Sequence, residues 1–458
     1  MRTAVFTVAS YNYFAFVETL MQSLMLTNPS WDRYAVLVDE CRQDANELLS
    51  GRFQLITIDG INLPNSKQMK FRYDILELNT AVKPFAIEML FTQYGYERVI
   101  YLDPDIYVYN KMEEVEDAFS RGYSFILTPH LTKELDDDGY EPNELAILRS
   151  GIYNLGFIAL QNTPDVKRMI QWWKKKLIKQ CIDDQTKGLF VDQKWIDFVP
   201  SRYSGVYILL HEGYNVAYWN LEQRKLFEDE KGYYSNGVPL VFFHFSGFML
   251  EKKVLSKYTN RLFTDNQDII CELKDSYKSM LLSNHYTEWN CIPYAYGMFS
   301  DGSKILKIHR LTYRNCDYLQ RICGKDPFLC SSMFEKEYLD KERILFDRYI
   351  NLKLEEFSKF DNLIIFGAGN IGKRVYGCLQ KHGLHHKLLC FCDNNAEKIH
   401  KLFGVDVVLP EDAMNRFPTG LFIITPVESR REILHQLLSN RINAQNISIF
   451  SSSLAGWL

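Results

Sequence analysis

Two aspartates separated by one residue, Asp103 and Asp105, follow the apolar segment 99–102. In an extended chain, residues two apart point to the same side, so both carboxylates can reach one ion. Pro104 between them restricts the backbone and favours an extended conformation for Asp103. Carboxylate oxygens are hard ligands that suit Mg²⁺ or Mn²⁺. The segment therefore predicts a divalent-cation site of the kind that holds a diphosphate.

The same spacing has a plainer interpretation, as a turn after a strand. A second pair with this spacing, Asp136 and Asp138, lies in a polar run that is typical of a solvated loop. What distinguishes Asp103 and Asp105 is the apolar sequence on both sides, which predicts that their charges sit inside the fold. Because burial of unpaired carboxylates is costly, we expect a counter-charge beside them.

Three further segments carry side chains that suit a ligand site. They supply Asn154 and Gly156, Asp192 and Gln193, and His244 and Gly247. Glycines allow the backbone to approach a ligand closely, and an imidazole can bind a metal. Each segment also has an ordinary interpretation, in which His244 is a core histidine, Asn154 caps a turn and Gln193 is exposed on a helix.

The elements around these residues alternate between strands and helices. Periodicity predicts strands at residues 5–8, 34–38, 53–58 and 99–102, and helices at 14–26 and 80–93. This alternation indicates a parallel α/β sheet, in which ligands bind beyond the carboxyl ends of the strands. Polar groups follow three of these ends, at residues 7–12, 39–40 and 103–105.

The 458 residues leave room for about three domains. We expect an α/β domain over residues 1–250, a mainly helical connecting domain over 251–357, and a small Rossmann-like α/β domain over 358–458. In the last of these, a strand at 363–366 is expected to lead through a glycine-rich turn into a helix, and a strand at 388–392 follows.

The C-terminal turn matches the dinucleotide fingerprint. Its residues are Gly367, Gly369, Gly372 and, at the end of the next strand, Asp393. They predict a site for a nucleotide or NAD(P). The alternative is that the glycines only allow a helix to pack closely on a strand, and that Asp393 belongs to a turn.

Composition argues against several classes of protein. With 53 basic and 57 acidic residues the net charge is -4, and no long basic run predicts a nucleic-acid partner. Ten scattered cysteines without a CxxC pair favour reduced thiols in a cytoplasmic protein. We expect no signal peptide and no membrane span. Residues 172–176 suit peripheral attachment to the inner face of a membrane, or a helix with buried tryptophan and solvated lysine.

In order and spacing, the site segments resemble GT-A fold glycosyltransferases, most of all bacterial enzymes of the family 8 type. In that family an Asp-x-Asp after a strand and a later histidine hold the metal, and Asp103, Asp105 and His244 match them. The resemblance covers about the first 250 residues. It implies the nucleotide-diphospho-sugar transferase fold, Mn²⁺ or Mg²⁺ as cofactor, and a nucleoside-diphosphate sugar as donor.

The resemblance also implies roles for residues that line the donor. Donor contacts are expected from Thr7, Ala9, Tyr11, Asp39, Lys83, Asp103, Gly156 and Gly247, and catalytic groups near the sugar from Asp192, Gln193 and Asn154. For Asp39 and Lys83 the alternatives are a cap at a strand end and a solvated residue near a helix start. The chain departs from the family pattern in its phosphate-gripping lysine, because Lys252 and Lys253 come later than the pattern places it.

Such an enzyme moves a sugar to a glycan or lipid-linked acceptor, here expected in bacterial surface polysaccharide synthesis. We expect the acceptor near residues 123–152 and the helical domain. Charge on the leaving diphosphate makes electrostatic stabilisation the main catalytic task. A retaining route, which we expect, would use Gln193 or Asp192 to stabilise the sugar, and an inverting route would use Asp192 as base. The alternatives are an NAD(P)-dependent oxidoreductase or nucleotide-binding module acting through the C-terminal domain, and a non-catalytic interaction protein. The sequence carries no signal for the oligomeric state.

Overall fold

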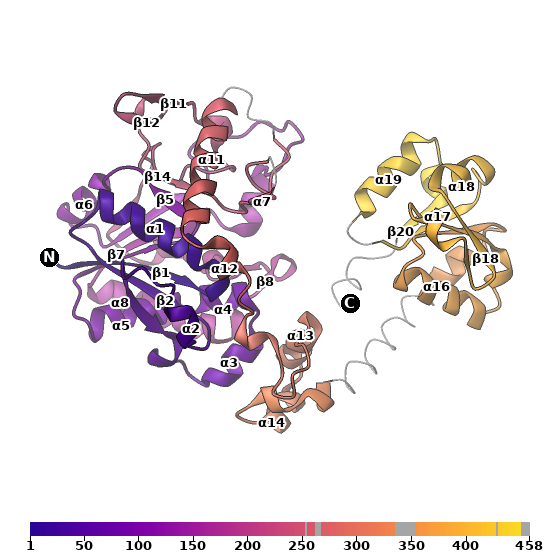
Figure 1. The fold of residues 1–458 in the computed structure, drawn as a ribbon, viewed down its shortest axis with the longest axis horizontal. Coiled ribbons are helices and arrows are strands. Elements are labelled where there is room, and N and C mark those ends of the chain that lie inside the picture. Colours follow the sequence, from indigo (N-terminus) through magenta and orange to yellow (C-terminus); the bar gives the residue numbers. More distant parts are fainter. Residues whose placement is uncertain (252–253, 262–266, 335–352, 427–428, 450–458) are drawn as a thin grey trace. The chain divides into compact units, whose positions relative to one another are not determined.

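A computed structural model of the chain describes residues 1–251, 254–261, 267–334, 353–426 and 429–449. They form two compact units, one of Met1–Ile305 with Cys316–Cys330 and one of Leu306–Asn315 with Ser331–Leu458 (Figure 1). Each unit contains its own sheet flanked by helices, which confirms the predicted α/β fold class. The domain boundaries at residues 250 and 357 stay predictions. Lys252 and Lys253 lie outside the described residues.

The first unit is built on a seven-stranded sheet with the order β10-β6-β7-β4-β1-β2-β3. Its strands, in chain order, are β1 (Thr3–Ala9), β2 (Asp32–Leu37), β3 (Gln54–Thr57), β4 (Arg98–Leu102), β6 (Phe125–Pro129), β7 (Tyr153–Gln161) and β10 (Val206–Ile208). The strands β3, β2, β1 and β4 are parallel, whereas β7 runs antiparallel to both β4 and β6. All four strands predicted in the first 110 residues are confirmed.

Helices pack on both faces of this sheet (Figure 1). One face is covered by α1 (Phe14–Thr27), α6 (Glu113–Ser120), α11 (Gln267–Ser283) and α12 (Tyr286–Asn290). The other is covered by α3 (Ser66–Arg72), α4 (Ile75–Ala81), α5 (Lys83–Thr92) and α8 (Pro164–Gln180). The predicted helix at 80–93 begins only at Lys83, because Pro84 is accommodated in a first turn but not in a helix interior.

Shorter elements complete the first unit. Its remaining helices are α2 (Gln43–Asn46), α7 (Glu144–Ser150), α9 (Gln193–Ile196), α10 (Val199–Arg202) and α14 (Asp317–Cys323). Its remaining strands are β5 (Ile106–Val108), β8 (Asp183–Asp184), β9 (Leu189–Phe190), β11 (Leu226–Asp229), β12 (Gly232–Ser235), β13 (Val238–Pro239) and β14 (Phe242–His244).

Two strand pairings bring distant segments together beyond the end of β4. In the antiparallel pair of β14 and β5, His244 lies opposite Ile106, and Phe245 N donates to Asp105 O at 2.8 Å. On the other side, Asp103 N donates to Gly156 O at 2.8 Å, which extends the pairing of β4 with β7. The backbone therefore fixes the position of both aspartates relative to His244 and Gly156.

The second unit contains a six-stranded sheet with the order β17-β18-β16-β15-β19-β20. Its strands are β15 (Leu363–Phe366), β16 (Leu388–Cys392), β17 (Lys401–Leu402), β18 (Val405–Val408), β19 (Leu421–Ile424) and β20 (Ile447–Ile449). Its helices include α13 (Lys307–Asn315), α16 (Asn370–Lys381), α17 (Ala396–Ile399), α18 (Pro410–Arg416) and α19 (Arg430–Ser439). All pairings except that of β17 with β18 are parallel, and the two predicted strands are confirmed as β15 and β16.

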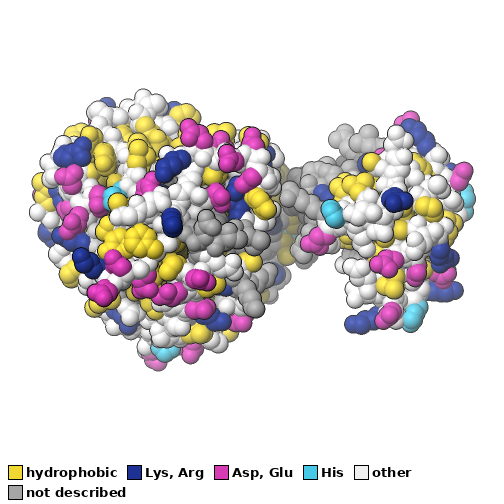
Figure 2. All heavy atoms as spheres, turned by 90° about the horizontal axis from the view of Figure 1, so that it is seen from above, with side chains coloured by type: hydrophobic (Ala, Val, Ile, Leu, Met, Phe, Trp, Pro, Cys, Tyr) yellow, Lys and Arg dark blue, Asp and Glu magenta, His cyan; other side chains and the backbone are white. Residues whose placement is uncertain are grey.

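Charged side chains of both signs are interspersed over the face of each unit seen in Figure 2. Among the described residues, we find no helix with both the length and the apolar character of a membrane span. In the segment predicted as a membrane contact, which belongs to α8, Trp173 is buried. Trp172 is half-buried, and the Arg202 guanidinium lies 4.9 Å from its ring centre.

Candidate functional site

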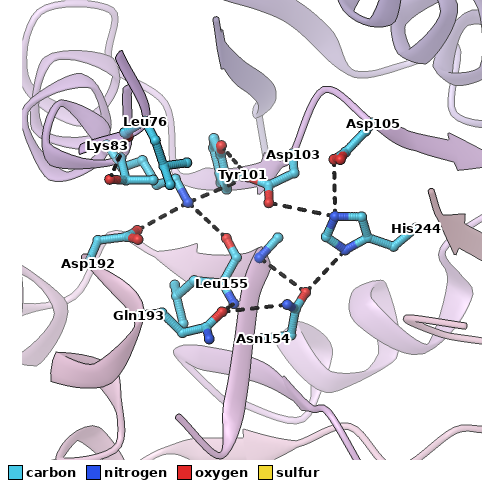
Figure 3. A network of polar contacts seen from close by, with 12 residues as sticks. Leu76, Lys83, Tyr101, Asp103, Asp105, Asn154, Leu155, Asp192, Gln193 and His244 are labelled. Carbon is cyan, nitrogen blue, oxygen red and sulfur yellow. Dashed lines mark hydrogen bonds and ion pairs between the residues drawn. The ribbon is translucent and has the colours of Figure 1, made fainter. Parts of the chain in front are cut away.

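Asp103, Asp105 and His244 converge at one point (Figure 3). One ligand atom from each lies within 4.8 Å of the others, and His244 Nε2 is 3.0 Å from Asp105 Oδ1 and 3.7 Å from Asp103 Oδ2. The side chains are 28%, 15% and 3% exposed, in that order, so the carboxylates face solvent while the imidazole is buried. Burial lowers the pKa of His244, but the carboxylates of Asp105 and Asp103 outweigh it and leave the pKa raised.

The donor set fits a hard divalent cation. Two atoms bound to one Mg²⁺ stand at most about 4 Å apart, because each bond is about 2.1 Å long, and the triad is close to that spacing. Charge balance points the same way. Within this network of described residues, Asp103, Asp105 and Asp192 are three carboxylates and Lys83, which contacts Asp103 and Asp192, is one lysine, so two negative charges remain when His244 is neutral.

Lys83 is the counter-charge expected beside the aspartates. Its Nζ lies 3.5 Å from Asp103 Oδ1 and 3.1 Å from Asp192 Oδ2, and it donates to Leu155 O at 3.0 Å (Figure 3). Burial raises the pKa of Asp192 to about 6, and Lys83 opposes this shift. The Lys83 pKa is itself raised, because the attraction of Asp103 and Asp192 exceeds the effect of burial. Both groups are therefore charged at neutral pH and form a buried ion pair.

Gly156 and Asn154 enclose the far side of the His244 ring. Asn154 Oδ1 lies 3.2 Å from His244 Nδ1 and accepts from Gly156 N at 3.2 Å. A Cβ atom on Gly156 would overlap the His244 ring and stand 2.7 Å from Asn154 Oδ1. The absence of a side chain at residue 156 thus allows the imidazole to lie against β7.

Asp192 and Gln193 are both buried and held from within the protein. Gln193 Oε1 accepts from Leu155 N at 2.9 Å, and its Nε2 donates to Ser150 O at 3.0 Å. Gln193 thereby fixes the strand that carries Asn154 and Gly156. The roles of Asp192 and Gln193 beside a sugar stay predictions.

A cavity of about 410 Å³ opens onto the triad. This volume is within the range of small-molecule sites. Besides the triad, its wall includes Ala9, Asn79, Gly247, Tyr13, Lys257 and Tyr258. Gly247 has a φ of 71°, and a Cβ there would stand 2.6 Å from Ser256 Oγ and from Tyr258 Cδ2, so this turn requires glycine.

The predicted nucleoside contacts are buried, and most of them pack within the protein. Thr7 and Tyr11 are fully buried, and the Tyr11 ring is stacked against Trp289 with centres 5.9 Å apart. Asp39 accepts from Ala295 N at 2.9 Å and Glu40 N at 3.0 Å, and burial raises its pKa. Of the predicted nucleoside contacts, Ala9 is part of the cavity wall described above. Their contacts with a nucleoside stay predictions.

Three residues of the site were not predicted from the sequence. Tyr101 donates from its hydroxyl to Asp103 Oδ1 at 2.5 Å, and His130 lies 3.2 Å from Asn154 Nδ2. Lys257 is on the cavity wall, and its backbone N donates to Gly247 O at 3.1 Å. Tyr101 could have been suspected, since it is two residues before Asp103 and points to the same side of the strand. Neither His130 nor Lys257 belongs to a recognisable motif.

The glycine turn of the second unit joins β15 to α16, as predicted. A Cβ on Gly372 would overlap Gly367 O, so Gly372 serves close packing of the helix, whereas a Cβ on Gly369 would meet no atom within 4 Å. Asp393 Oδ2 accepts from Ala368 N at 2.8 Å, and Oδ1 accepts from Asn395 N at 2.9 Å. The carboxylate thus holds the turn itself, and nucleotide or NAD(P) binding there stays a prediction.

Comparisons with known proteins add relatives but no assigned function. No family model matches the chain. It is 24% identical over 260 residues to the uncharacterized protein YfnF of Bacillus subtilis (strain 168), a match that covers 55% of this chain and 83% of YfnF. It is 32% identical over 104 residues to the uncharacterized protein YfnD of the same organism, and this match spans only a third of YfnD (33%) and 22% of this chain.

Among solved structures, the chain is similar to the galactosyltransferase LgtC in complex with donor and acceptor sugar analogs, with 14% identity and a TM-score of 0.35 over 60% of this chain and 95% of LgtC. It is also similar to the glycosyltransferase GlyE of Streptococcus pneumoniae TIGR4, with 14% identity and a TM-score of 0.36 over 99% of this chain and 96% of GlyE. Because these scores are low, we take neither fold nor function from them.

Proposed function

We propose that the first unit is a metal-dependent GT-A glycosyltransferase, which moves a sugar from a nucleoside diphosphate to a glycan or lipid-linked acceptor. One observation carries this proposal. Asp103, Asp105 and His244, which come from segments up to 141 residues apart, converge on the wall of a cavity. The cavity lies beyond the carboxyl ends of the parallel strands β1 and β4, where open α/β sheets bind ligands.

Asp103, Asp105 and His244 would hold Mn²⁺ or Mg²⁺. When bound, the cation supplies Lewis-acid stabilisation of the negative charge that develops on the leaving diphosphate. Lys257 on the cavity wall offers a second positive charge to the same phosphates, in place of the lysine of the family pattern. Lys83 does not face the donor in this proposal, since its ion pairs keep Asp103 and Asp192 in position.

The proposal extends to the acceptor and the stereochemistry. Tyr13 and Tyr258 are exposed on the cavity wall, and rings of this kind suit the apolar face of a sugar. We favour a retaining reaction, in which the amide and carboxylate of Gln193 and Asp192 stabilise positive charge on the sugar. A role in bacterial surface polysaccharide synthesis, at the cytoplasmic face of the membrane, belongs to the same proposal.

The test is metal-dependent binding of nucleoside diphosphates, measured as a shift of the thermal unfolding midpoint with Mn²⁺ or EDTA. A ligand at a hundred times its Kd should stabilise the first unit by about 2.7 kcal/mol. Asp105→Asn should remove the metal-dependent part of this shift. Asp136→Asn is the matched control, because Asp136 has the same Asp-x-Asp spacing but lies in a loop and is not among the residues that line the cavity.

An unchanged response in Asp105→Asn would contradict the metal assignment. A parallel titration with NAD tests the oxidoreductase alternative, which predicts stabilisation that does not depend on the metal.

A further inference from the structure

A series of buried polar contacts leads away from the metal triad. His130, which follows β6, has Nδ1 3.2 Å from Ile152 O and Nε2 3.2 Å from Asn154 Nδ2. Asn154 Oδ1 is in turn 3.2 Å from His244 Nδ1, and His244 Nε2 faces Asp105. His130, Asn154 and His244 are all less than a tenth exposed, so these contacts are shielded from water.

The hydrogen-bond donors and acceptors in this series of contacts can be assigned by starting from the Ile152 carbonyl. A carbonyl oxygen only accepts, so His130 Nδ1 must carry a proton that it donates to Ile152 O. Burial lowers the pKa of His130 to about 4, so the ring is neutral at neutral pH and its Nε2 is an acceptor. The Asn154 amide nitrogen therefore donates to His130, and its oxygen is turned toward His244.

The orientation of the Asn154 amide decides which nitrogen of His244 is free. With Oδ1 toward His244, Nδ1 of that ring donates its proton to Asn154, so the nitrogen that faces Asp105 and Asp103 is Nε2, whose proton is the one that a bound cation replaces. With the amide reversed, an N–H group would face Nδ1. The proton of a neutral His244 would then sit on Nε2, where it blocks metal binding.

We propose that His130 is a positioning residue that acts through Asn154 to hold His244 in the tautomer that binds the metal. This proposal rests on the metal site proposed above. Partners of this kind behind a metal ligand are worth about 10- to 100-fold in metal affinity. Two other contacts favour the same orientation of the Asn154 amide: Gly156 N donates to its Oδ1 at 3.2 Å, and Gln193 Oε1 lies 3.5 Å from its Nδ2. The effect of losing His130 therefore falls near the lower end of this range.

Two substitutions separate this role from simple packing. In His130→Asn, the amide nitrogen takes the place of Nδ1 and retains the bond to Ile152 O, but the side chain is too short to reach Asn154. In His130→Gln, the amide oxygen takes the place of Nε2 and retains the acceptor for Asn154. Mn²⁺ affinity of the full chain, measured from the EPR signal of free Mn²⁺ without any sugar nucleotide, reports the site without activity.

We expect Mn²⁺ to bind about tenfold more weakly to His130→Asn and within about threefold of the wild-type affinity to His130→Gln. Wild-type affinity in His130→Asn, or equal losses in both variants, would overturn the role of His130. If the wild-type protein itself binds no Mn²⁺, the proposed metal site fails first, and the two failures are therefore distinguishable.

A second pair of variants tests the next link if His130→Asn does not fold. Asn154→Asp retains an oxygen acceptor for His244 Nδ1, whereas Asn154→Leu does not. Midpoints of thermal unfolding in EDTA show whether each variant is folded. If Mn²⁺ binds more weakly to Asn154→Leu but not to Asn154→Asp, the role of Asn154 between His130 and His244 is supported. Equal Mn²⁺ binding in the two variants overturns it.

Discussion

Replacing Gly156 by alanine should damage the metal site without changing a ligand. The added Cβ would stand 2.8 Å from His244 Nδ1 and 2.7 Å from Asn154 Oδ1, and closer still to the Cε1 atom of the ring. Ordinary contacts of a Cβ begin at 3.4 Å, so the imidazole must retreat by at least about 0.6 Å. The edge of Trp219, with ring centres 5.2 Å apart, limits where the ring can go.

The size of the effect follows from the precision that such sites need. Ligand groups work when held within about 0.5 Å of their productive position, and the displacement of His244 exceeds that limit. We expect Mn²⁺ affinity to fall about 10- to 100-fold, which corresponds to about 1.4–2.7 kcal/mol. Without the clash, alanine at this position in a strand would stabilise the fold by about 0.5–1 kcal/mol relative to glycine.

The assay is Mn²⁺ binding by calorimetry, together with thermal unfolding in EDTA. Gly377→Ala is the control, because Gly377 lies within α16 and a Cβ there meets no atom within 4 Å. Gly156→Ala with wild-type Mn²⁺ affinity and an unchanged or raised unfolding midpoint would refute the steric reasoning, because the ring would then have room that the structure does not show.

Two further predictions concern the buried charges. Because the pKa of His130 is about 4 in the folded protein and 6.5 as its ordinary value, the stability that this residue contributes is present above pH 6.5 and is lost as the pH falls toward 4, by about 3 kcal/mol in total. Urea unfolding of the first unit should show this loss of unfolding free energy at acid pH in the wild type and less of it in His130→Gln. An equal dependence of the unfolding free energy on pH in the two proteins would contradict it. Lys83→Met leaves the Asp192 carboxylate buried without its partner and should cost about 3–5 kcal/mol in the same assay. Adding Asp192→Asn should recover part of that loss, and a cost below about 1 kcal/mol would show that the ion pair is not needed.

The sequence was sufficient for the parallel part of the fold and for the two aspartates of the metal triad. Strands that are buried on both faces have apolar residues at nearly every position, without an alternation of apolar and polar side chains. Such runs, bounded by polar residues, identified β1, β2 and β4 in the sequence. Asp103 and Asp105 follow such a run directly. They could therefore be singled out without any knowledge of the fold.

His244 could be linked to these aspartates only through its place in the family pattern. It lies 139 positions after Asp105, and its ring nevertheless reaches the Asp105 carboxylate. The contact depends on the antiparallel pairing that sets His244 opposite Ile106. Such a pairing is a tertiary contact between distant segments, which no local spacing encodes.

The direction of β7 is what sequence reasoning could not supply. In a parallel sheet, ligand groups are sought after the strands, yet Asn154 and Gly156 lie at the beginning of β7. They reach the site because β7 is antiparallel to β4, so that its first residues lie beside the last residues of β4. His130 and Lys257 were missed for a related reason, since only the folded backbone brings them to the site.

Lys83 lies at a helix start, as one of its two interpretations predicted, but it is buried and not solvated, and the donor contact of the other interpretation stays a prediction. The sequence placed it either at the donor or at a helix start, and it is indeed the first residue of α5. Its charge nevertheless turns inward to Asp192 and Asp103. A lysine followed by proline carries no information about which way its side chain will point. In the folded protein the Lys83 Nζ also lies 4.2 Å from the centre of the Tyr101 ring.

The helices α11 and α12 have a practical consequence for anyone who wishes to isolate this site. Tyr277 of α11 stacks on Phe245, the neighbour of His244, with ring centres 3.8 Å apart, and Asn284 Nδ2 donates to Thr19 Oγ1 of α1 at 2.9 Å. A recombinant fragment cut at residue 250 would expose the ring of Phe245 and the apolar side of α1 to water. A fragment designed for crystallisation or calorimetry should therefore extend to Cys330, the last residue of the first unit.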